Sequence, residues 1–145
     1  MNRLARDESI CAMLVGDFSD DRLLLHDIFR SFGWRLWEAR RRRAALRRLA
    51  SSLVHVVVAE RDFPHWNWKR ILSDFRLLRE PPLLIVTSRL ADEALWSEAL
   101  NLGAHDVLAR PFDRNEVERA IASAGRRFEF PPERARPMSR AVSVA

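Results

Sequence analysis

The sequence predicts an α/β fold in which a doubly wound, five-stranded parallel sheet carries helices on both faces. Three observations favour this fold class. Short apolar runs without polar alternation, such as residues 53–59, are typical of strands that are buried on both faces. Segments with apolar residues at helical spacing separate these runs. Five strands that alternate with five helices imply parallel pairing through right-handed crossovers.

The first strand is predicted at residues 10–15, where the first apolar run ends in Gly16. Asp20 and Asp21 follow in a first helical turn, where negative charge complements the helix dipole. Gly33 is expected to end this helix. The apolar residues that we expect to face the core from it are Leu24, Ile28 and Phe32.

Residues 34–39 form a short predicted second strand, and residues 40–51 a helix with arginines on its solvent side. Residues 53–59 are the most apolar run and are predicted to be the central strand. The next helix follows Pro64 and is expected to continue to the Pro81-Pro82 pair. Its apolar residues recur at i, i+3, i+4, i+7 and i+10, and they are Trp68, Ile71, Leu72, Phe75 and Leu78.

The last part of the chain continues the same alternation. Residues 83–88 are the fourth predicted strand, and a helix runs from Asp92 to Gly103. Residues 105–109 are the fifth strand. Asp113 is expected to cap the final helix, which we predict to end at Gly125.

These elements divide the chain of 145 residues into three parts. Residues 1–9 are expected to be an N-terminal extension and residues 10–125 a single domain. Residues 126–145 contain prolines and scattered arginines without periodicity, so we predict a basic, mobile tail.

Composition and charge narrow the class of protein. The net charge of +5 comes almost wholly from arginine, because Lys69 is the only lysine. A GC-rich genome would produce the same excess, so we disfavour a nucleic-acid partner while keeping a small basic nucleic-acid-binding protein as an alternative. The single cysteine, Cys11, excludes a disulfide framework. No apolar run approaches the length of a membrane span, and we expect a cytoplasmic protein.

Motifs of common enzymes and cofactor sites are absent from the sequence. With only 4 glycines it has neither a phosphate-cradling glycine-rich loop nor a Gly-x-Ser-x-Gly elbow. The four histidines are dispersed, which argues against a zinc site. We therefore expect no enzyme activity, no catalytic residue and no resident cofactor.

Polar residues instead follow the predicted strands, at the edge where parallel sheets bind their ligands. The first strand is followed by Gly16-Asp17, the third by Glu60 with Pro64 four residues later, and the fourth ends in Thr87-Ser88. The fifth leads into Arg110-Pro111-Phe112. In this order, the motifs resemble the receiver domain of bacterial two-component response regulators over residues 10–125.

The resemblance implies a flavodoxin-like sheet with strand order 2-1-3-4-5 and a role in phosphorelay signal transduction. It places Glu60 at the position of the phosphorylated aspartate and Thr87 at that of the hydroxyl that approaches the phosphoryl group. Val107 stands where the family has an aromatic residue, so we expect simple packing there. The bond between Arg110 and Pro111 corresponds to one that is often cis in the family.

Two departures from the family pattern predict a degenerate pocket, that is, a pseudo-receiver. The family binds Mg²⁺ with paired acids after the first strand, but Gly16 supplies no carboxylate. Glu60 carries its carboxylate one methylene further out than aspartate, and such misplacement lowers rates strongly. We expect Arg110, which replaces the family's lysine, to form a bidentate pair with Glu60 and Asp17 in place of the metal. An active phospho-acceptor that uses a neighbouring acid, such as Asp62 or Asp17, remains an alternative.

We therefore expect a receiver-like protein that acts by protein–protein interaction, with a histidine kinase or another signalling protein as partner. Trp66 is predicted to be an interface residue because tryptophan is enriched at binding hot spots, whereas Trp68 fits the core stripe. In the family, homodimers use the face of the fourth helix, fifth strand and fifth helix. Here that face would include Trp96 and Glu98.

Overall fold

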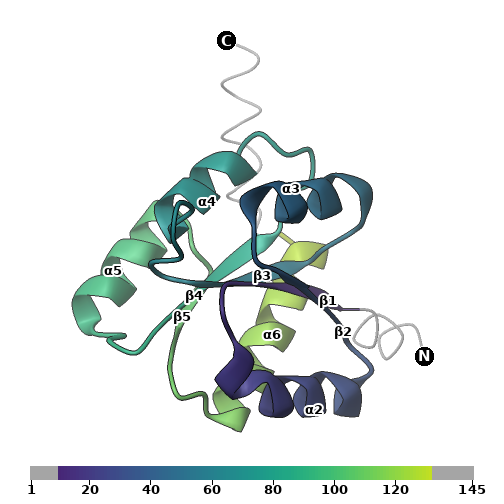
Figure 1. The fold of residues 1–145 in the computed structure, drawn as a ribbon, viewed down its shortest axis with the longest axis vertical. Helices are drawn as coiled ribbons and strands as arrows, with labels where there is room; N and C mark the ends of the chain where they lie inside the picture. The colour runs from purple at the N-terminus through teal and green to yellow at the C-terminus, as the bar shows by residue number, and fades with distance from the viewer. Residues whose placement is uncertain (1–9, 132–145) are drawn as a thin grey trace.

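A computed structural model describes residues 10–131 of the chain (Figure 1). The five strands are β1 (Cys11–Val15), β2 (Arg35–Ala39), β3 (Val56–Glu60), β4 (Leu83–Ser88) and β5 (Asp106–Ala109). The helices are the 3-10 turn η1 (Ser19–Asp21), α2 (Arg22–Phe32), α3 (Arg42–Ser51), α4 (Trp68–Phe75), α5 (Glu93–Leu102) and α6 (Arg114–Glu129). The predicted extension 1–9 and the tail residues 132–145 lie outside the described residues.

All neighbouring strands pair in parallel, in the order β2-β1-β3-β4-β5. This confirms the predicted fold class and strand order. Helices α3, α4 and α5 cover one face of the sheet, and α2 and α6 cover the other (Figure 1). β3 lies at the centre, and its last residue, Glu60, is in register with Thr87 of β4.

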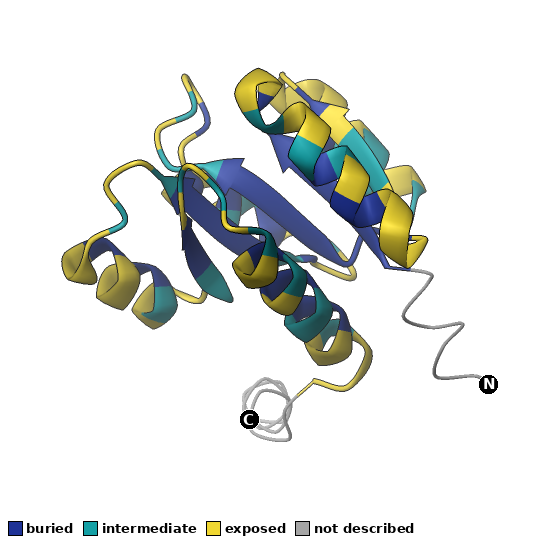
Figure 2. Ribbon diagram, turned by 90° about the horizontal axis from the view of Figure 1, so that it is seen from below, coloured by how far each residue is buried: buried dark blue, intermediate teal, exposed yellow. Residues whose placement is uncertain are grey.

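Two hydrophobic cores flank the sheet because alternate strand residues point to opposite faces. Met13 and Val57 belong to the core under α3, α4 and α5, whereas Leu14 and Val58 belong to the core under α2 and α6. The strands β1, β3 and β4 are therefore buried between helices whose outer surfaces are exposed, whereas the edge strand β2 is partly exposed (Figure 2). No helix within residues 10–131 is long and apolar enough to cross a membrane.

The buried stripe of α2 differs from the predicted one. Leu25, Ile28 and Phe29 are buried, whereas Phe32 is 40% exposed. Phe32 stacks on Trp34 with ring centroids 4.4 Å apart, so it covers the start of β2 rather than entering the core. Gly33 ends the helix in the left-handed conformation, as predicted.

Two helix ends also differ from the sequence prediction. α4 ends at Phe75, and Leu78 still packs on the core from the turn that follows. α6 continues past Gly125 to Glu129. A Cβ atom on Gly125 would lie 2.8 Å from Cγ1 of Ile10, so this glycine allows close packing of the helix on the sheet and does not end the helix.

Trp66 belongs to the core and not to an interface, which corrects the sequence prediction. It is 1% exposed, and its indole Nε1 donates a hydrogen bond of 2.7 Å to Asp74 of α4. Arg42 of α3 donates to the same carboxylate at 2.8 Å. The buried ring thereby helps to fix the loop after β3 against α4, and Trp68 is also buried in this core, as predicted.

These contacts predict a pH-dependent stability. The hydrogen bond from Arg42, and then that from Trp66, lower the pKa of Asp74 from its ordinary value, although burial opposes them. A group whose pKa is lower in the folded state stabilises the protein at pH values above its unfolded-state pKa, which is about 3.9 for aspartate. This stabilisation is lost as the pH falls through the folded-state pKa. We expect Asp74→Asn to lower the free energy of unfolding at pH 7, and the difference from wild type to shrink on acidification.

Urea unfolding at a series of pH values checks this expectation. Asp62→Asn is the matched control because the Asp62 side chain is 83% exposed and, among residues 10–131, forms an ion pair only with Arg61, at 3.9 Å. We expect this control to change stability little at any of these pH values. If the free energy of unfolding of Asp74→Asn stayed below that of wild type by the same amount down to the lowest pH, the lowered pKa of Asp74 would be contradicted.

Candidate functional site

The carboxyl edge of the sheet brings together residues from four strand ends. Asp17 follows β1, Glu60 ends β3, Thr87 lies near the end of β4, and Arg110 follows β5. Each is a predicted site residue. The parallel topology places them at one edge although they are widely separated in the sequence.

The Glu60 carboxylate is held by hydrogen bonds to both of its oxygens. Oε1 accepts from the backbone N–H of Asp17 at 2.8 Å. Oε2 accepts from Nη1 of Arg110 at 3.0 Å. With 28% of its side chain exposed, Glu60 is turned toward the end of β1 and is not extended into solvent.

Gly16 provides the space that the Glu60 side chain occupies. Gly16 is buried and has a φ of +133°, a conformation that side-chain-bearing residues rarely adopt. A Cβ atom built on it would lie 2.7 Å from Cγ and 2.9 Å from Cδ of Glu60. The sequence identified Gly16 only as a missing carboxylate. The structure adds that the glycine is required for the observed position of Glu60.

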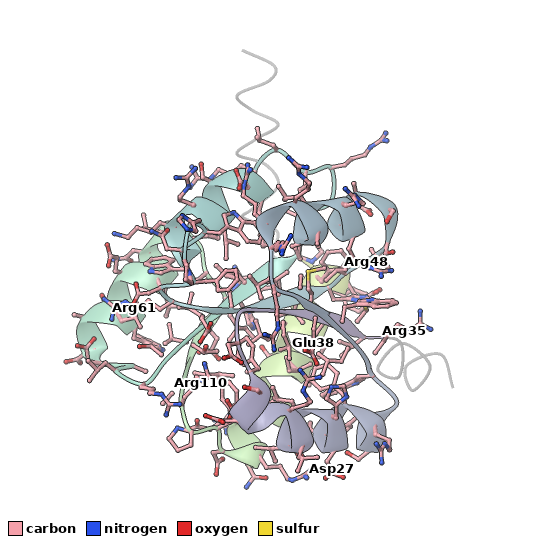
Figure 3. All side chains as sticks on the ribbon, viewed as in Figure 1. Asp27, Arg35, Glu38, Arg48, Arg61 and Arg110 are labelled. Carbon is pink, nitrogen blue, oxygen red and sulfur yellow. The ribbon has the colours of Figure 1, made fainter. Side chains whose placement is uncertain are left out.

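Arg110 is the centre of the charge network at this edge (Figure 3). Its side chain is 7% exposed, and its Nη2 donates to Oδ2 of Asp21 at 2.6 Å and to the backbone carbonyl of Asp17 at 3.2 Å. The guanidinium carbon lies 4.7 Å from the ring centroid of Phe18 and 5.6 Å from that of Phe112. Two carboxylates and two aromatic rings therefore surround a largely buried cation.

The second carboxylate partner of Arg110 is Asp21 and not Asp17, which corrects the sequence prediction. The side chain of Asp17 is 66% exposed, and its Oδ1 accepts from the hydroxyl of Ser19 at 2.7 Å and from the Ser19 N–H at 3.1 Å. These bonds lower the pKa of the Asp17 carboxyl. Asp21 was expected only to complement the helix dipole. Asp21 lies in η1, the first element after β1. This position near the carboxyl edge of the sheet could have indicated from the sequence that Asp21 is a site residue.

The other predicted pocket residues lie beside Glu60. Thr87 is 1% exposed, and its hydroxyl donates to the carbonyl of Ala59 at 3.3 Å. The bond between Arg110 and Pro111 is cis, as the resemblance implied, and Val107 is buried in the core. An open pocket of about 400 Å³ adjoins this group and is lined by Glu60, Arg61, Asp62, Pro64, Thr87, Ser88, Arg89, Leu90 and Arg110.

The two residues expected on the dimer face point to different sides of α5. Trp96 of α5 is 50% exposed. Glu98 instead forms an ion pair of 2.7 Å with Lys69 of α4, so it lies on the side of α5 that faces α4. This position corrects the expectation that the two residues share the face formed with β5 and α6.

Sequence comparison finds similar bacterial proteins, although no protein-family model matches. "Transcriptional regulatory protein CrdR" of Helicobacter pylori is 32% identical over 109 residues, which are 70% of this chain and 50% of that protein. The chain thus matches about half the length of this relative. "Sporulation initiation phosphotransferase F" of Bacillus subtilis is 24% identical over 109 residues, covering 75% of this chain and 88% of that protein. "Chemotaxis protein CheY" of Thermotoga maritima is 24% identical over 110 residues, covering 75% of this chain and 92% of that protein.

Solved structures share the fold at lower identity. Full-length FixJ from B. japonicum has a TM-score of 0.73 and 22% identity, covering 92% of this chain and 66% of that chain. The receiver domain of the Francisella response regulator 1452 has a TM-score of 0.71 and 19% identity, covering 82% and 98%. The Ssk1 receiver match in the Saccharomyces cerevisiae Ypd1 complex has a TM-score of 0.68 and 15% identity, covering 82% and 90%. The chain is therefore similar in sequence to these bacterial proteins over 109 or 110 residues, and it shares the fold of receiver domains such as that of the Francisella response regulator 1452.

Proposed function

We propose that this protein is a receiver-like module of two-component signalling that is not phosphorylated in the usual way and acts by protein–protein recognition. The proposal rests on one observation, which is that the carboxylate of Glu60, at the acceptor position, is already hydrogen-bonded within the protein. Both carboxylate oxygens accept hydrogen bonds, one of them from the buried Arg110. A carboxylate whose two oxygens are both hydrogen-bonded within the protein favours one conformational state without a phosphoryl group.

The residues at this edge do not fit a magnesium ion. Mg²⁺ requires oxygen ligands in near-octahedral geometry. Gly16 supplies no side-chain oxygen, and the carboxylates of Glu60 and Asp21 are already paired with Arg110. The guanidinium charge would also repel a cation at short range. We propose that Arg110 provides internally the positive charge that the metal provides in the family.

Phosphoryl transfer to Glu60 is disfavoured for a related reason. A nucleophilic carboxylate needs an oxygen that is free and aligned with the phosphorus atom. Turning Glu60 toward the pocket would break its hydrogen bonds to Asp17 and Arg110. A misplacement of about 1 Å in a positioned site costs about a hundredfold in rate.

The partner that we propose is a histidine kinase, a phosphotransfer protein or another signalling protein in the cytoplasm. The Ssk1 receiver was crystallised with the histidine phosphotransfer protein Ypd1, which is a precedent for such a contact. Leu23 of α2 is 88% exposed close to the site, and it lines a surface pocket with Leu24 and Arg114. A homodimer through α5, β5 and α6, in which the half-exposed Trp96 of α5 would take part, is a further proposal for the same class of interaction.

Incubation with acetyl phosphate and Mg²⁺, followed at once by intact-protein mass spectrometry, tests the proposal. We expect no phosphoryl adduct on the wild-type chain, because the Glu60 oxygens are engaged. Sporulation initiation phosphotransferase F, treated in parallel, serves as the control for the reagent. A stoichiometric adduct that maps to Glu60, Asp62 or Asp17 would overturn the proposal and favour an active phospho-acceptor.

A further inference from the structure

A second surface, at the opposite end of β3 from Glu60, combines an open groove with exposed leucines. The groove lies between the ends of α3 and α4 and has a volume of about 390 Å³. It is lined by residues 49–54 and by residues 77–80. Leu53 is 52% exposed and Leu77 is 85% exposed, whereas Leu49 and Leu78 are partly buried against the core. We call this the α3–α4 groove.

The chain next to the groove is strongly basic. Residues 39–59 contain six arginines and no acid, and Arg47 and Arg48 are the two in the half of α3 that leads to the groove. Arg42, at the other end of α3, is paired with Asp74. Arg43 and Arg47 are exposed on α3. Arg48 covers the ring of Trp37 on β2, with 3.7 Å from the guanidinium carbon to the ring centroid. Figure 3 shows Arg48 and Arg35 at the same edge of the molecule.

The short segment after α4 adds to this charge. Arg76 and Arg79 are both exposed in the turn that follows α4. Glu80 is the only acid among the described residues that line the groove. The groove is therefore lined by leucines together with polar residues, and the arginines near it outnumber its one acid.

The arginines near the groove limit the kinds of molecule that can bind there. A second copy that used the same surface would bring two sets of arginines together, which is unfavourable. Residues 132–145 carry three arginines and one glutamate, and residues 1–9 carry two arginines and two acids. Neither end of the chain supplies the net negative charge that complements the surface.

A nucleic acid would satisfy the arginines but not the leucines. Its phosphates carry the charge, yet the stacking platforms that bind single strands need a free aromatic face. The ring of Trp37 is covered by Arg48. Exposed leucines beside a groove instead fit an apolar side chain of a protein segment.

We propose that the α3–α4 groove binds an acidic segment of a protein partner and holds one of that segment's leucine-type side chains between Leu53 and Leu77. The inference rests on the proposed function in that both require a protein partner. It does not depend on the state of Glu60.

Fluorescence anisotropy with a labelled synthetic peptide tests the inference on the full chain. The probe is a peptide of glutamate and alanine with leucines spaced four residues apart, which forms an acidic amphipathic helix when bound. We expect saturable binding at low salt that weakens as salt screens the charges. Leu77→Ser and Arg47→Glu are each expected to weaken binding about tenfold or more.

Controls separate this outcome from the alternatives. Arg119→Glu on α6 makes the same charge change at an exposed site on the other side of the sheet, and it should leave binding unchanged. Circular dichroism verifies that Leu77→Ser is folded. The same peptide with serine in place of leucine should bind weakly.

Three results would overturn the inference. They are absence of binding at low salt, equal binding by the groove variants and Arg119→Glu, or tighter binding of oligothymidylate or of a synthetic peptide of residues 132–145. Peptide binding without an acetyl phosphate adduct supports both proposals. Peptide binding together with a phosphoryl adduct would reject only the proposal about Glu60, whereas absence of both would reject only the proposal about the groove.

Discussion

Replacing Gly16 with alanine is expected to lower the free energy of unfolding by about 2 to 6 kcal/mol. The first cause is the backbone, because a residue with a side chain at a φ of +133° is strained by about 1 to 3 kcal/mol. The second is overpacking against Cγ and Cδ of Glu60, which costs about 1 to 3 kcal/mol. Urea unfolding at pH 7 measures the sum.

Gly103 provides the control that separates the two causes. It has a φ of +113°, but a Cβ atom there would meet no atom within 4 Å. Gly103→Ala should therefore show the backbone cost alone. In a Glu60→Ala background, Gly16→Ala should also lose the overpacking cost, giving a coupling energy of about 1 kcal/mol or more between the two positions. Equal costs for Gly16→Ala and Gly103→Ala would refute the dependence of Glu60 on Gly16.

Replacing Arg110 with methionine is expected to lower the free energy of unfolding by about 3 to 5 kcal/mol. Methionine keeps much of the side-chain volume but leaves two carboxylates without their cation. The side chains of Arg110, Asp21 and Glu60 are only 7%, 12% and 28% exposed, so water compensates little. The loss comes from leaving charges unpaired and exceeds what the intact ion pairs contribute.

Arg114→Met is the matched control for this prediction. Arg114 also contacts two carboxylates, those of Asp27 and Glu118, but its side chain is 41% exposed. We expect a much smaller loss there, because exposed ion pairs contribute little. Adding Glu60→Gln and Asp21→Asn to Arg110→Met should recover stability. If Arg110→Met proved no less stable than Arg114→Met, the charge network would not have the structural role that we assign to it.

The sequence by itself determined the architecture and the edge at which the site lies. The apolar runs specify strands buried on both faces, and their alternation with helical stripes specifies parallel pairing. The caps at Asp92 and Asp113 and the left-handed end of α2 at Gly33 were also predictable. These signals are local in the chain, and the parallel topology then places Glu60 beside Thr87 and Arg110.

Only the tertiary structure decided which side chains meet at that edge. Asp21 replaces Asp17 as the partner of Arg110 because the turn of η1 directs one carboxylate inward while Ser19 holds the other at the surface. Trp66 is buried because Asp74, eight residues later, accepts its indole N–H. Position 16 requires a glycine because the side chain of Glu60, which comes from β3, occupies the space of a Cβ atom there. Such choices depend on distances between segments that are remote in sequence, and no local pattern of residues encodes those distances.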